Sequence, residues 1–391
     1  MKSKKKVIVT GDSSNLCRYI GGFKTKILHI NSYYKNSFFY KNLFDKQVKE
    51  GLDIDVFVPV STDTKSVQFE HGSYATLSAN HNKYDRFLFH LKHYKIFKDI
   101  QKKYLISNFS DVHAHSLFSN GYIALKLKEK YNIPYIVAVR NTDVNVFFEK
   151  MPHLRKLGLK IMVESKAVIF LSQSYRDTVL EEYVPEKFKK NIYNKSEIIP
   201  NGIDNYWFKN LSVKKNLIEK NTLKILYVGD ININKNLTTT SEAVKVLKNQ
   251  GYNIEFTIVG KVKNNKVYEK IKDLSFINYI SPQPKEELLE IYKNNDIYVM
   301  PSIKETFGLV YAEAMSQGLP VIYSKKQGFD QQFDNGLIGY AVDCYDHIEI
   351  SEKIKEIYSD YKFYSTNCNH LVEKFKWDDI ALKYSVLYSK S

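Results

Sequence analysis

Short apolar strands that alternate with helices, in two successive series, constrain the fold of this chain most strongly. This alternation is typical of parallel sheets with helices on both faces, because neighbouring parallel strands need a crossover connection. The first series predicts, in chain order, a strand at 26–31, a helix at 37–50, strands at 53–60 and 112–115, a helix at 119–130 and a strand at 135–140.

The second series repeats the pattern after a polar, Lys- and Asn-rich stretch at 209–222 that marks a break between domains. Its expected elements are a strand at 224–229, a helix at 237–249, a strand at 253–260, a helix at 285–294, a strand at 297–301, a helix at 307–317 and a strand at 320–323. The end of the chain, from Phe375 to Lys390, has a helical pattern. We therefore expect two doubly wound α/β domains.

Composition excludes several classes of protein. The chain has 391 residues, 43% of them hydrophobic and 14% aromatic, which excludes a disordered chain and suffices for two cores. Cys17, Cys344 and Cys368 lie too far apart for a disulfide scaffold or a cysteine zinc site, which favours a reducing compartment. No apolar run reaches the roughly 18 residues of a spanning helix, and the one at 7–10 is too short for a signal peptide. We expect a cytoplasmic protein.

The net charge of +15 favours an anionic partner such as a nucleic acid, an anionic membrane or a phosphorylated substrate. Nearly all of the excess is lysine, and the last arginine of the chain is Arg176. Because readers of nucleic acids commonly use arginine on base edges, this bias argues against nucleic-acid binding. The alternative is that the lysine content reflects only the base composition of the genome.

The stretch from 301 to 322 is the most specific in the chain. Glu305 stands at the end of a strand and loop, and Glu313 follows eight positions later, two turns into the expected helix. Apolar residues surround Glu313, so its carboxylate needs polar partners, which two ribose hydroxyls would supply. The alternative is that Glu313, Ser316 and Gln317 form the solvent-exposed polar face of an amphipathic helix.

The start of this helix predicts a phosphate site. We expect Thr306 to cap the helix, whose first backbone N–H groups then belong to Phe307, Gly308 and Leu309. Gly308 lets a ligand approach the backbone closely. A helix N-terminus at the carboxyl end of a parallel strand favours bound anions.

The 301–322 stretch resembles the E-x7-E signature of the retaining nucleotide-sugar glycosyltransferases of family 4, or group 1, which have the GT-B fold. The resemblance covers most of the chain and extends to 111–121, 137–143, 198–204, 225–236 and 375–384. It implies an acceptor-binding Rossmann-like domain at 1–204, a donor-binding one at 205–375 and a deep cleft between them. It also implies that a final helix at 376–391 returns to the first domain.

The resemblance also implies roles for single residues. Glu305 would hold hydroxyls of the donor sugar, Glu313 the nucleotide ribose, and Lys235 the diphosphate, together with the amides of 307–309. The full donor-binding set that it predicts is Gly229, Lys235, Gly260, Lys261, Thr306, Phe307, Gly308, Leu309 and Glu313. The catalytic set that it predicts is Glu305, Arg140, Asp143 and His115.

Two departures from the family pattern bear on catalysis. Asp230 stands where the family usually has an arginine on the diphosphate, and lysine lacks the planar fork that binds phosphate bidentately. Arg140, in Arg-Asn-Thr-Asp at 140–143, stands where the family often has the histidine of His-Gly-Ser-Asp. We expect Arg140 to reach the donor and partly replace the missing arginine.

Two alternatives to a sugar transferase remain. One is a non-catalytic GT-B partner with a weakened donor site, and the other, less favoured by the E-x7-E context, is a GT-B sugar-nucleotide epimerase.

His113 and His115 alternate with Val112 and Ala114, so both side chains point to one face of a strand. They are candidates for a structural or acceptor-side polar contact, for a direct catalytic contact and, with no third ligand evident, for a metal site. The family is usually metal-independent, so we expect no metal and no cofactor.

We expect an enzyme that transfers a sugar from a nucleoside-diphosphate sugar, expected to be a UDP-sugar, with retention of configuration. The acceptor would be a glycan or a polyprenyl-pyrophosphate-linked glycan in the synthesis of a cell-surface polysaccharide such as a capsule. The Lys- and aromatic-rich region 83–104 suits such a lipid, or the anionic inner face of the plasma membrane. The alternative is that region 83–104 is an ordinary amphipathic helix packed on the sheet.

The run at 7–12 is expected to be a plain strand rather than a phosphate-binding turn.

Overall fold

A computed structural model describes residues 26–63, 69–212 and 222–389 of the chain. The strand expected at 7–12 lies outside these residues. Within them, no helix is both long and apolar enough to cross a bilayer.

The first domain is built on one parallel sheet. Its strands are β1 (Lys26–Ile30), β2 (Asp53–Ser61), β3 (Ala75–His81), β4 (Asp111–Ala114), β5 (Tyr135–Ala138), β6 (Ala167–Phe170) and β7 (Ser196–Ile198). They are ordered β3-β2-β1-β4-β5-β6-β7. The order reverses between β1 and β4, which pair in parallel with His29 beside His113.

The second domain repeats this arrangement in a sheet ordered β10-β9-β8-β11-β12-β13. Its strands are β8 (Leu223–Val228), β9 (Ile254–Val259), β10 (Ile277–Ile280), β11 (Ile297–Val299), β12 (Val321–Ser324) and β13 (Gly339–Val342). Numbered within the domain, this is the doubly wound order 3-2-1-4-5-6. Its order reverses between β8 and β11. In folds of this kind ligands bind at the carboxyl ends of the strands where the order reverses.

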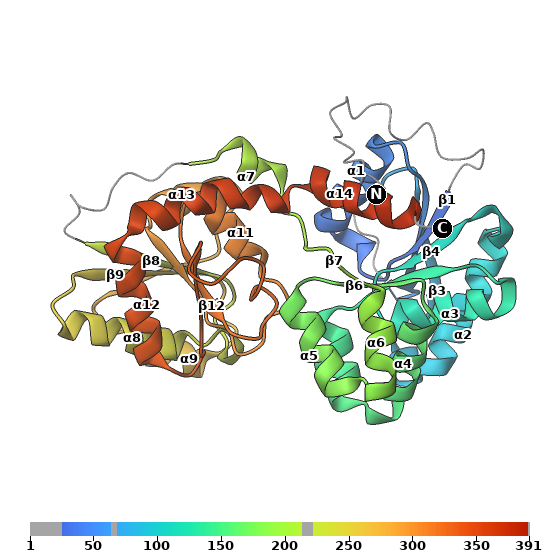
Figure 1. The fold of residues 1–391 in the computed structure, drawn as a ribbon, viewed down its shortest axis with the longest axis horizontal. Coiled ribbons are helices and arrows are strands. Elements are labelled where there is room, and N and C mark those ends of the chain that lie inside the picture. The colour runs from blue at the N-terminus through green and yellow to red at the C-terminus, as the bar shows by residue number, and fades with distance from the viewer. Residues whose placement is uncertain (1–25, 64–68, 213–221, 390–391) are drawn as a thin grey trace, which may run out of the picture.

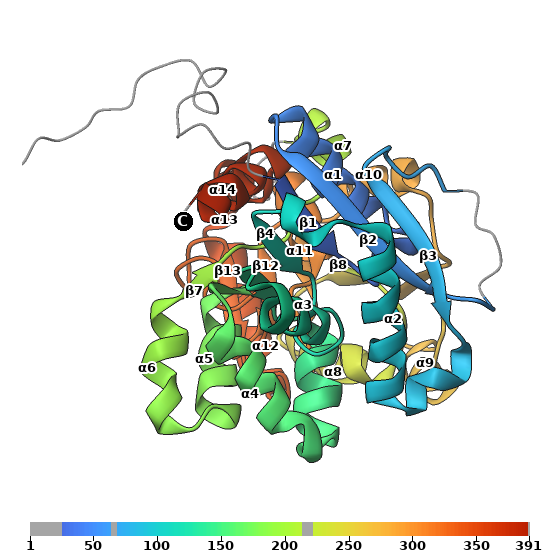
Figure 2. The same ribbon diagram turned by 90° about the vertical axis from the view of Figure 1, so that its right-hand side faces the viewer.

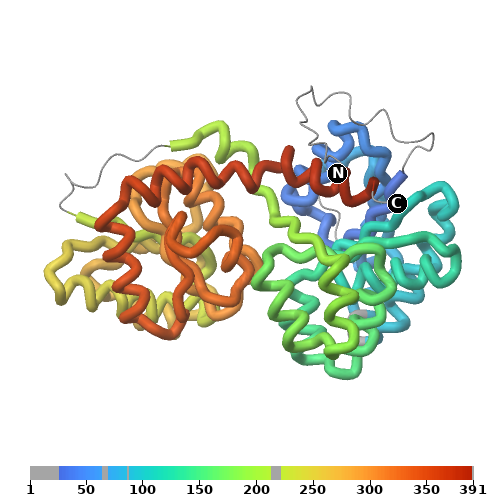
Figure 3. Tube along the Cα trace, in the orientation of Figure 1, coloured from blue at the N-terminus to red at the C-terminus, as the bar shows by residue number. Residues whose placement is uncertain are grey.

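Helices cover both faces of the two sheets (Figures 1 and 3). In the first domain they are α1 (Phe38–Lys49), α2 (Phe89–Lys103), α3 (Ser119–Tyr131), α4 (Arg155–Glu164), α5 (Gln173–Tyr183) and α6 (Glu186–Asn194). Those that follow are α7 (Asn205–Lys209), α8 (Leu237–Asn249), α9 (Asn265–Ile271), α10 (Lys285–Lys293), α11 (Leu309–Ser316), α12 (His347–Ser359), α13 (Tyr361–Leu371) and α14 (Trp377–Ser389).

The last helix, α14, leaves the second domain and packs on the first (Figure 1). Its apolar residues Ile380, Leu387 and others join Ile27 of β1 and Phe44 of α1 in one buried cluster. Figure 2 shows α1 and α14 on one side of the first sheet and α4, α5 and α6 on the other. The crossing back to the first domain, expected from the family resemblance, is therefore present.

The segment that carries the chain between the domains is tightly packed against the start of α14. A Cβ atom on Gly202 would lie 2.5 Å from the ring of Trp377, so only glycine fits this contact without a shift. The backbone N–H of Ile203 donates to the carbonyl of Phe375 over 3.1 Å. These contacts join the two passages of the chain from one domain to the other.

The expected α/β class and two parallel sheets are confirmed, and the strongly patterned elements lie within a few residues of their predicted bounds. Several elements were not predicted, among them β3, β10 and β13. In β3 the sequence Ala-Thr-Leu-Ser-Ala-Asn-His is polar because the strand forms the exposed edge of the sheet. An edge strand does not need the apolar run that identifies a central one.

The docking of α14 predicts unequal effects for two leucines of the same helix. Leu387 is 3% exposed and Leu382 is 55% exposed. Leu387→Ala should lower the free energy of unfolding of the first domain by about 2–5 kcal/mol, because it leaves a cavity under the helix. Leu382→Ala, the matched control, should change it by less than about 0.5 kcal/mol. Urea unfolding of both variants measures this, and equal effects would contradict the docking.

Candidate active site

A pocket of about 350 Å³ lies beside β8 and β11, at the carboxyl ends where the second sheet reverses its order. Gly229 and Lys235 line it from the β8 side, and Met300 and residues 305–310 line it from the β11 side. Asn201, from the segment that joins the domains, completes it. The sequence predicted most of this lining, including Glu305, Thr306, Phe307, Gly308 and Leu309.

The pocket contains an ion pair between Lys235 and Glu305. The Lys235 ammonium lies 2.5 Å from a carboxylate oxygen of Glu305, and the side chains are only 20% and 14% exposed. Lys235 ends the short helical turn η8 (Ile233–Lys235), which the side chain of Asn232 caps. The backbone N–H of Glu305 donates to Oε1 of Gln327 over 2.8 Å. A hydrogen bond thus fixes the backbone at each residue of the pair, and the two residues are 70 positions apart in the chain.

The helix that follows, α11, begins later than the sequence predicted. Gly308 is its N-cap, with a φ of 73°, and the helix starts at Leu309. The expectation that Thr306 caps the helix is wrong: its hydroxyl oxygen is buried and has no hydrogen-bond partner among the described residues. The cap position requires the left-handed backbone that glycine adopts most easily. The backbone N–H groups of Leu309 and Val310 have no acceptor within the helix and so remain suited to an anion, whereas that of Tyr311 donates to the carbonyl of Gly308 over 3.0 Å.

Glu313 lies outside the pocket lining, one turn beyond Leu309 on the same face of α11. The Tyr292 hydroxyl donates to a carboxylate oxygen of Glu313 over 3.4 Å. Burial raises the pKa of Glu313 to about 7, although the hydrogen bond from Tyr292 lowers it. The interpretation of Glu313 as part of a freely exposed polar stripe does not fit this environment.

The other predicted donor residues differ in their positions. Gly260 allows β8 and β9 to approach, since a Cβ atom there would lie 1.9 Å from the carbonyl oxygen of Gly229. Neither Gly260 nor Lys261 lines the pocket, and Lys261 is exposed. Asp230 is also exposed and outside the lining. Its carboxylate therefore does not place a negative charge inside the pocket.

Arg140 approaches the pocket from the first domain. It follows β5, is almost fully buried, and donates from Nη1 to Oδ1 of Asn201 over 3.3 Å. Asn201 lines the pocket and Arg140 does not, so the guanidinium contacts a lining residue without itself reaching the pocket. Its Nε has no hydrogen-bond partner among the described residues.

Asp143, predicted to be catalytic, is fully buried and supports the backbone around Arg140. Its carboxylate accepts hydrogen bonds from the backbone N–H groups of Leu117, Phe118 and Arg140 over 2.8–3.0 Å. Burial raises its pKa to about 6, and the three amides oppose this rise. In this structure Asp143 is a positioning residue that ties the loop after β4 to the loop after β5.

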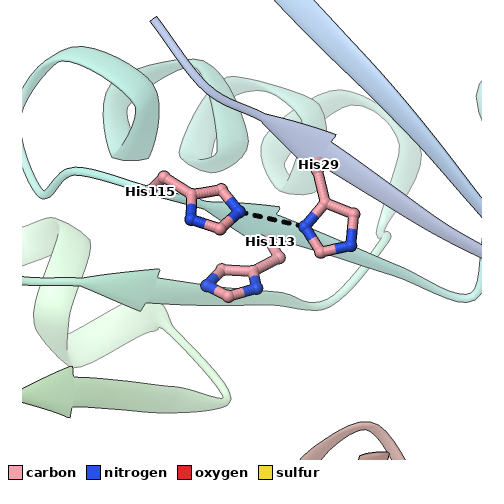
Figure 4. A group of neighbouring side chains, drawn as sticks. All are labelled: His29, His113 and His115. Atoms are coloured by element: carbon pink, nitrogen blue, oxygen red, sulfur yellow. Dashed lines mark hydrogen bonds between the residues drawn. The ribbon is translucent and has the colours of Figure 1, made fainter. Parts of the chain in front are cut away.

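His115, also predicted to be catalytic, forms a cluster with His29 and His113 (Figure 4). All three histidines are fully buried. Nε2 of His115 is hydrogen-bonded to Nδ1 of His29 over 3.0 Å, and Nδ1 of His113 to the hydroxyl of Tyr388 over 2.6 Å. Burial lowers the pKa of all three, so the rings are neutral at pH 7. His115 does not line the pocket.

The third histidine corrects the sequence analysis, which found no partner for the pair at 113 and 115. One ligand atom from each ring lies within 4.8 Å of the others, a spacing that permits a metal ion. However, the nearby Arg140 guanidinium disfavours additional positive charge in this group. The hydrogen bonds to β1 and α14 instead indicate a role in joining α14 to the sheet.

Two residues of this region were missed by sequence reasoning, Asn201 and His29. Asn201 stands in the Ile-Ile-Pro-Asn-Gly-Ile-Asp segment that marked the link between domains, which could have identified it. His29 gave no comparable signal, because its position beside His113 depends on the pairing of β1 with β4.

Comparison with known proteins identifies both halves of the chain. A family model described as Glycosyltransferase Family 4 matches residues 37–205, and one described as Glycosyl transferases group 1 matches residues 208–373. A glycosyltransferase of Methanocaldococcus jannaschii is 24% identical over 71% of this chain and 74% of its own. A capsular polysaccharide biosynthesis glycosyltransferase of Staphylococcus aureus is 24% identical over 57% of this chain and 62% of its own.

Solved structures share the fold over nearly the whole chain. Sucrose-phosphate synthase of Thermosynechococcus elongatus has a TM-score of 0.73 at 17% identity, covering 93% of this chain and 98% of that one. The Anabaena protein HepE, in complex with UDP and glucose, has a TM-score of 0.66 at 13% identity, covering 94% and 100%. At these identities the likeness establishes the two-domain GT-B architecture.

The hydrogen bonds of Asp143 predict a stability defect that depends on the replacement. Asp143→Ala leaves three buried backbone donors without an acceptor, each costing about 1–3 kcal/mol. Asp143→Asn retains one acceptor oxygen and should lose distinctly less. Thermal unfolding at pH 7 compares the two variants. An Ala variant as stable as the Asn variant would show that these amides do not depend on the carboxylate.

Proposed function

The chain belongs to the group 1 glycosyltransferases and is a transferase; we propose that it transfers a sugar from a nucleoside-diphosphate sugar to a hydroxyl of a glycan acceptor, with retention of configuration. The observation that carries the proposal is the Lys235–Glu305 ion pair beside the first turn of α11. It combines a cation and free amides for a diphosphate with a carboxylate for sugar hydroxyls.

In this proposal, the donor diphosphate lies against the first-turn amides of α11 and the ammonium of Lys235. The ammonium has three N–H donors, so it can bind a phosphate oxygen and still contact Glu305. The amides are fixed by the backbone before the ligand arrives, which makes them effective at stabilising charge that develops during reaction. The donor domain has no arginine, and Arg140, which contacts Asn201 from the first domain, adds a guanidinium charge near the pocket.

The transfer step needs no enzyme nucleophile. The acceptor oxygen attacks the anomeric carbon on the face from which the diphosphate departs, and the bond between that carbon and the phosphate oxygen breaks. The bond's electron pair remains on the phosphate oxygen, which takes the proton of the acceptor hydroxyl. Glu305 holds the sugar hydroxyls and Glu313 the ribose, while the cations stabilise the leaving diphosphate.

We propose UDP as the nucleotide, because HepE, which shares this fold, was solved with UDP and with UDP-glucose. For the acceptor we propose a glycan or a lipid-linked glycan in cell-surface polysaccharide synthesis, supported by the capsular relative of Staphylococcus aureus.

Contact with an anionic membrane is a further part of the proposal, and α2 supports it. Leu91 and Tyr94 are exposed, as is Leu88 just before the helix, whereas Ile96 and Ile100 are buried against the first sheet. The helix therefore packs as an ordinary amphipathic element and still presents apolar side chains to the outside.

The role of Lys235 predicts a loss of donor binding. Lys235→Ala should weaken UDP-glucose binding roughly tenfold or more, because it removes a charge-assisted contact to phosphate. Lys272→Ala, at an exposed lysine of the same domain that does not line the pocket, is the control and should bind normally. Isothermal titration calorimetry measures both. Unchanged binding by Lys235→Ala would exclude Lys235 from the donor site, and no binding by the wild type would favour a non-catalytic partner.

The raised pKa of Glu313 predicts a pH dependence of donor binding. A carboxylate accepts both ribose hydroxyls better than the protonated acid, and the ionised fraction rises as the pH rises through about 7. The affinity for UDP-glucose should therefore fall between pH 8 and pH 6, by up to about tenfold. The two phosphates of UDP-glucose stay ionised over this range, so the ligand adds no titration of its own.

Glu313→Gln provides the matched control, since glutamine keeps the shape and does not titrate. The variant should bind more weakly than the wild type at pH 8 and show a flat profile. A flat profile in the wild type would separate Glu313 from the nucleotide.

A further inference from the structure

A second pocket, of about 200 Å³, lies at the carboxyl edge of the first sheet. Its walls come from the ends of β2 and β3, the turn after β1, one face of α2 and the first turn of α3. All of its lining residues belong to the first domain, so it is separate from the pocket that holds Lys235 and Glu305.

The two lysines of this pocket form no ion pair among the described residues, although Asp85 lies near enough to stabilise the charge of Lys92. Lys35 and Lys92 line it, and none of its lining residues is acidic. Within the described part of the chain neither lysine has a carboxylate within 4 Å, and the nearby Asp85 is bound through both oxygens to Lys95. Lys92 is half-buried, and burial lowers its pKa. A half-buried ammonium group that no carboxylate contacts is costly, and a bound anion would relieve that cost.

The same pocket also has unused hydrogen-bonding capacity. Nδ1 of His93 donates to the carbonyl of Phe89 over 2.6 Å, which leaves Nε2 as an acceptor in the neutral ring. That Nε2 and the side-chain Nδ2 of Asn120 are both buried without a hydrogen-bond partner among the described residues. His93 and Asn120 both line the pocket and are each 2% exposed. Asn120 belongs to the first turn of α3, where its backbone N–H donates to the Ser116 hydroxyl over 3.1 Å, so only its side chain is available to a ligand.

We propose that this pocket binds a phosphate ester of the acceptor, with Lys35 and Lys92 on the phosphate and His93 and Asn120 on neighbouring hydroxyls. The inference rests on the proposed function, because it specifies the acceptor of the same reaction as a phosphorylated compound. A neutral sugar would satisfy His93 and Asn120 but leave both ammonium groups without a counter-charge.

The position of the pocket fits an acceptor site. Asn120 lies just after the Leu117–Phe118 backbone that Asp143 holds, and Asp143 also holds the backbone of Arg140. Arg140 in turn contacts Asn201 at the wall of the donor pocket. A short run of fixed loops thus connects the hydroxyl-binding end of the proposed acceptor site, at Asn120, with the donor pocket.

The phosphate can belong to a lipid carrier or to a free phosphorylated sugar, and two probes distinguish these sources. Geranyl phosphate represents the isoprenyl phosphate monoester, and glucose 6-phosphate represents the sugar ester. Calorimetric titration of the full-length protein should detect binding of at least one probe. The other probe should have a lower affinity, because it lacks some of the contacts that the natural acceptor makes. Lys92→Met should weaken that binding at least tenfold. Lys103→Met, at the exposed end of the same helix, is the matched control.

Binding of UDP-glucose separates this proposal from the proposed function. Lys92→Met should bind UDP-glucose like the wild type, whereas Lys235→Ala should lose UDP-glucose and keep the phosphate ester. Loss of the ester in Lys235→Ala alone would place it in the donor pocket and overturn the inference. Failure of both probes to bind the wild type would also overturn it, even if UDP-glucose binds.

Discussion

The reversal of strand order at the centre of each parallel sheet determines where this chain can bind ligands. At β1/β4 and at β8/β11 the loops diverge to opposite faces, and helix N-termini face the gap between them. The Lys235–Glu305 pair stands at one reversal, and the Asp143 carboxylate fixes the loops beside the other. The α14 helix and the Gly202–Trp377 contact hold the two domains together.

The distribution of positive charge follows from this arrangement. No arginine of the chain lies in the second domain, so in the proposed function the pocket there depends on one lysine and on backbone amides. Arg140 supplies the missing guanidinium from the opposite domain, but only behind Asn201. A donor site of this kind binds diphosphate through preorganised amides more than through bidentate side chains. The acceptor site proposed in the first domain would likewise bind phosphate through lysines, Lys35 and Lys92, rather than through arginine.

Much of the fold could be predicted from the sequence, because central parallel strands are short apolar runs and their helices end at Gly51, Gly251 and Gly318. Part of the site followed from the E-x7-E spacing, since Glu305 and the amides after it are neighbours in sequence. What could not be predicted depends on tertiary contacts. The bonds from Asp143 to Leu117 and Phe118 and the pairing of His29 with His115 join residues distant in the chain, and the start of α11 depends on the left-handed backbone of Gly308 rather than on the hydroxyl of Thr306.

The most direct test of the account is whether a nucleoside diphosphate binds the free protein. Thermal unfolding should be followed with UDP, GDP and ADP and with their sugar conjugates. A working donor site predicts stabilisation by one base in preference to the others, about 2.7 kcal/mol when the ligand is at 100 times its dissociation constant. If no nucleotide raises the unfolding temperature, the pocket at the second reversal is not a donor site in the free protein, and the central claim fails.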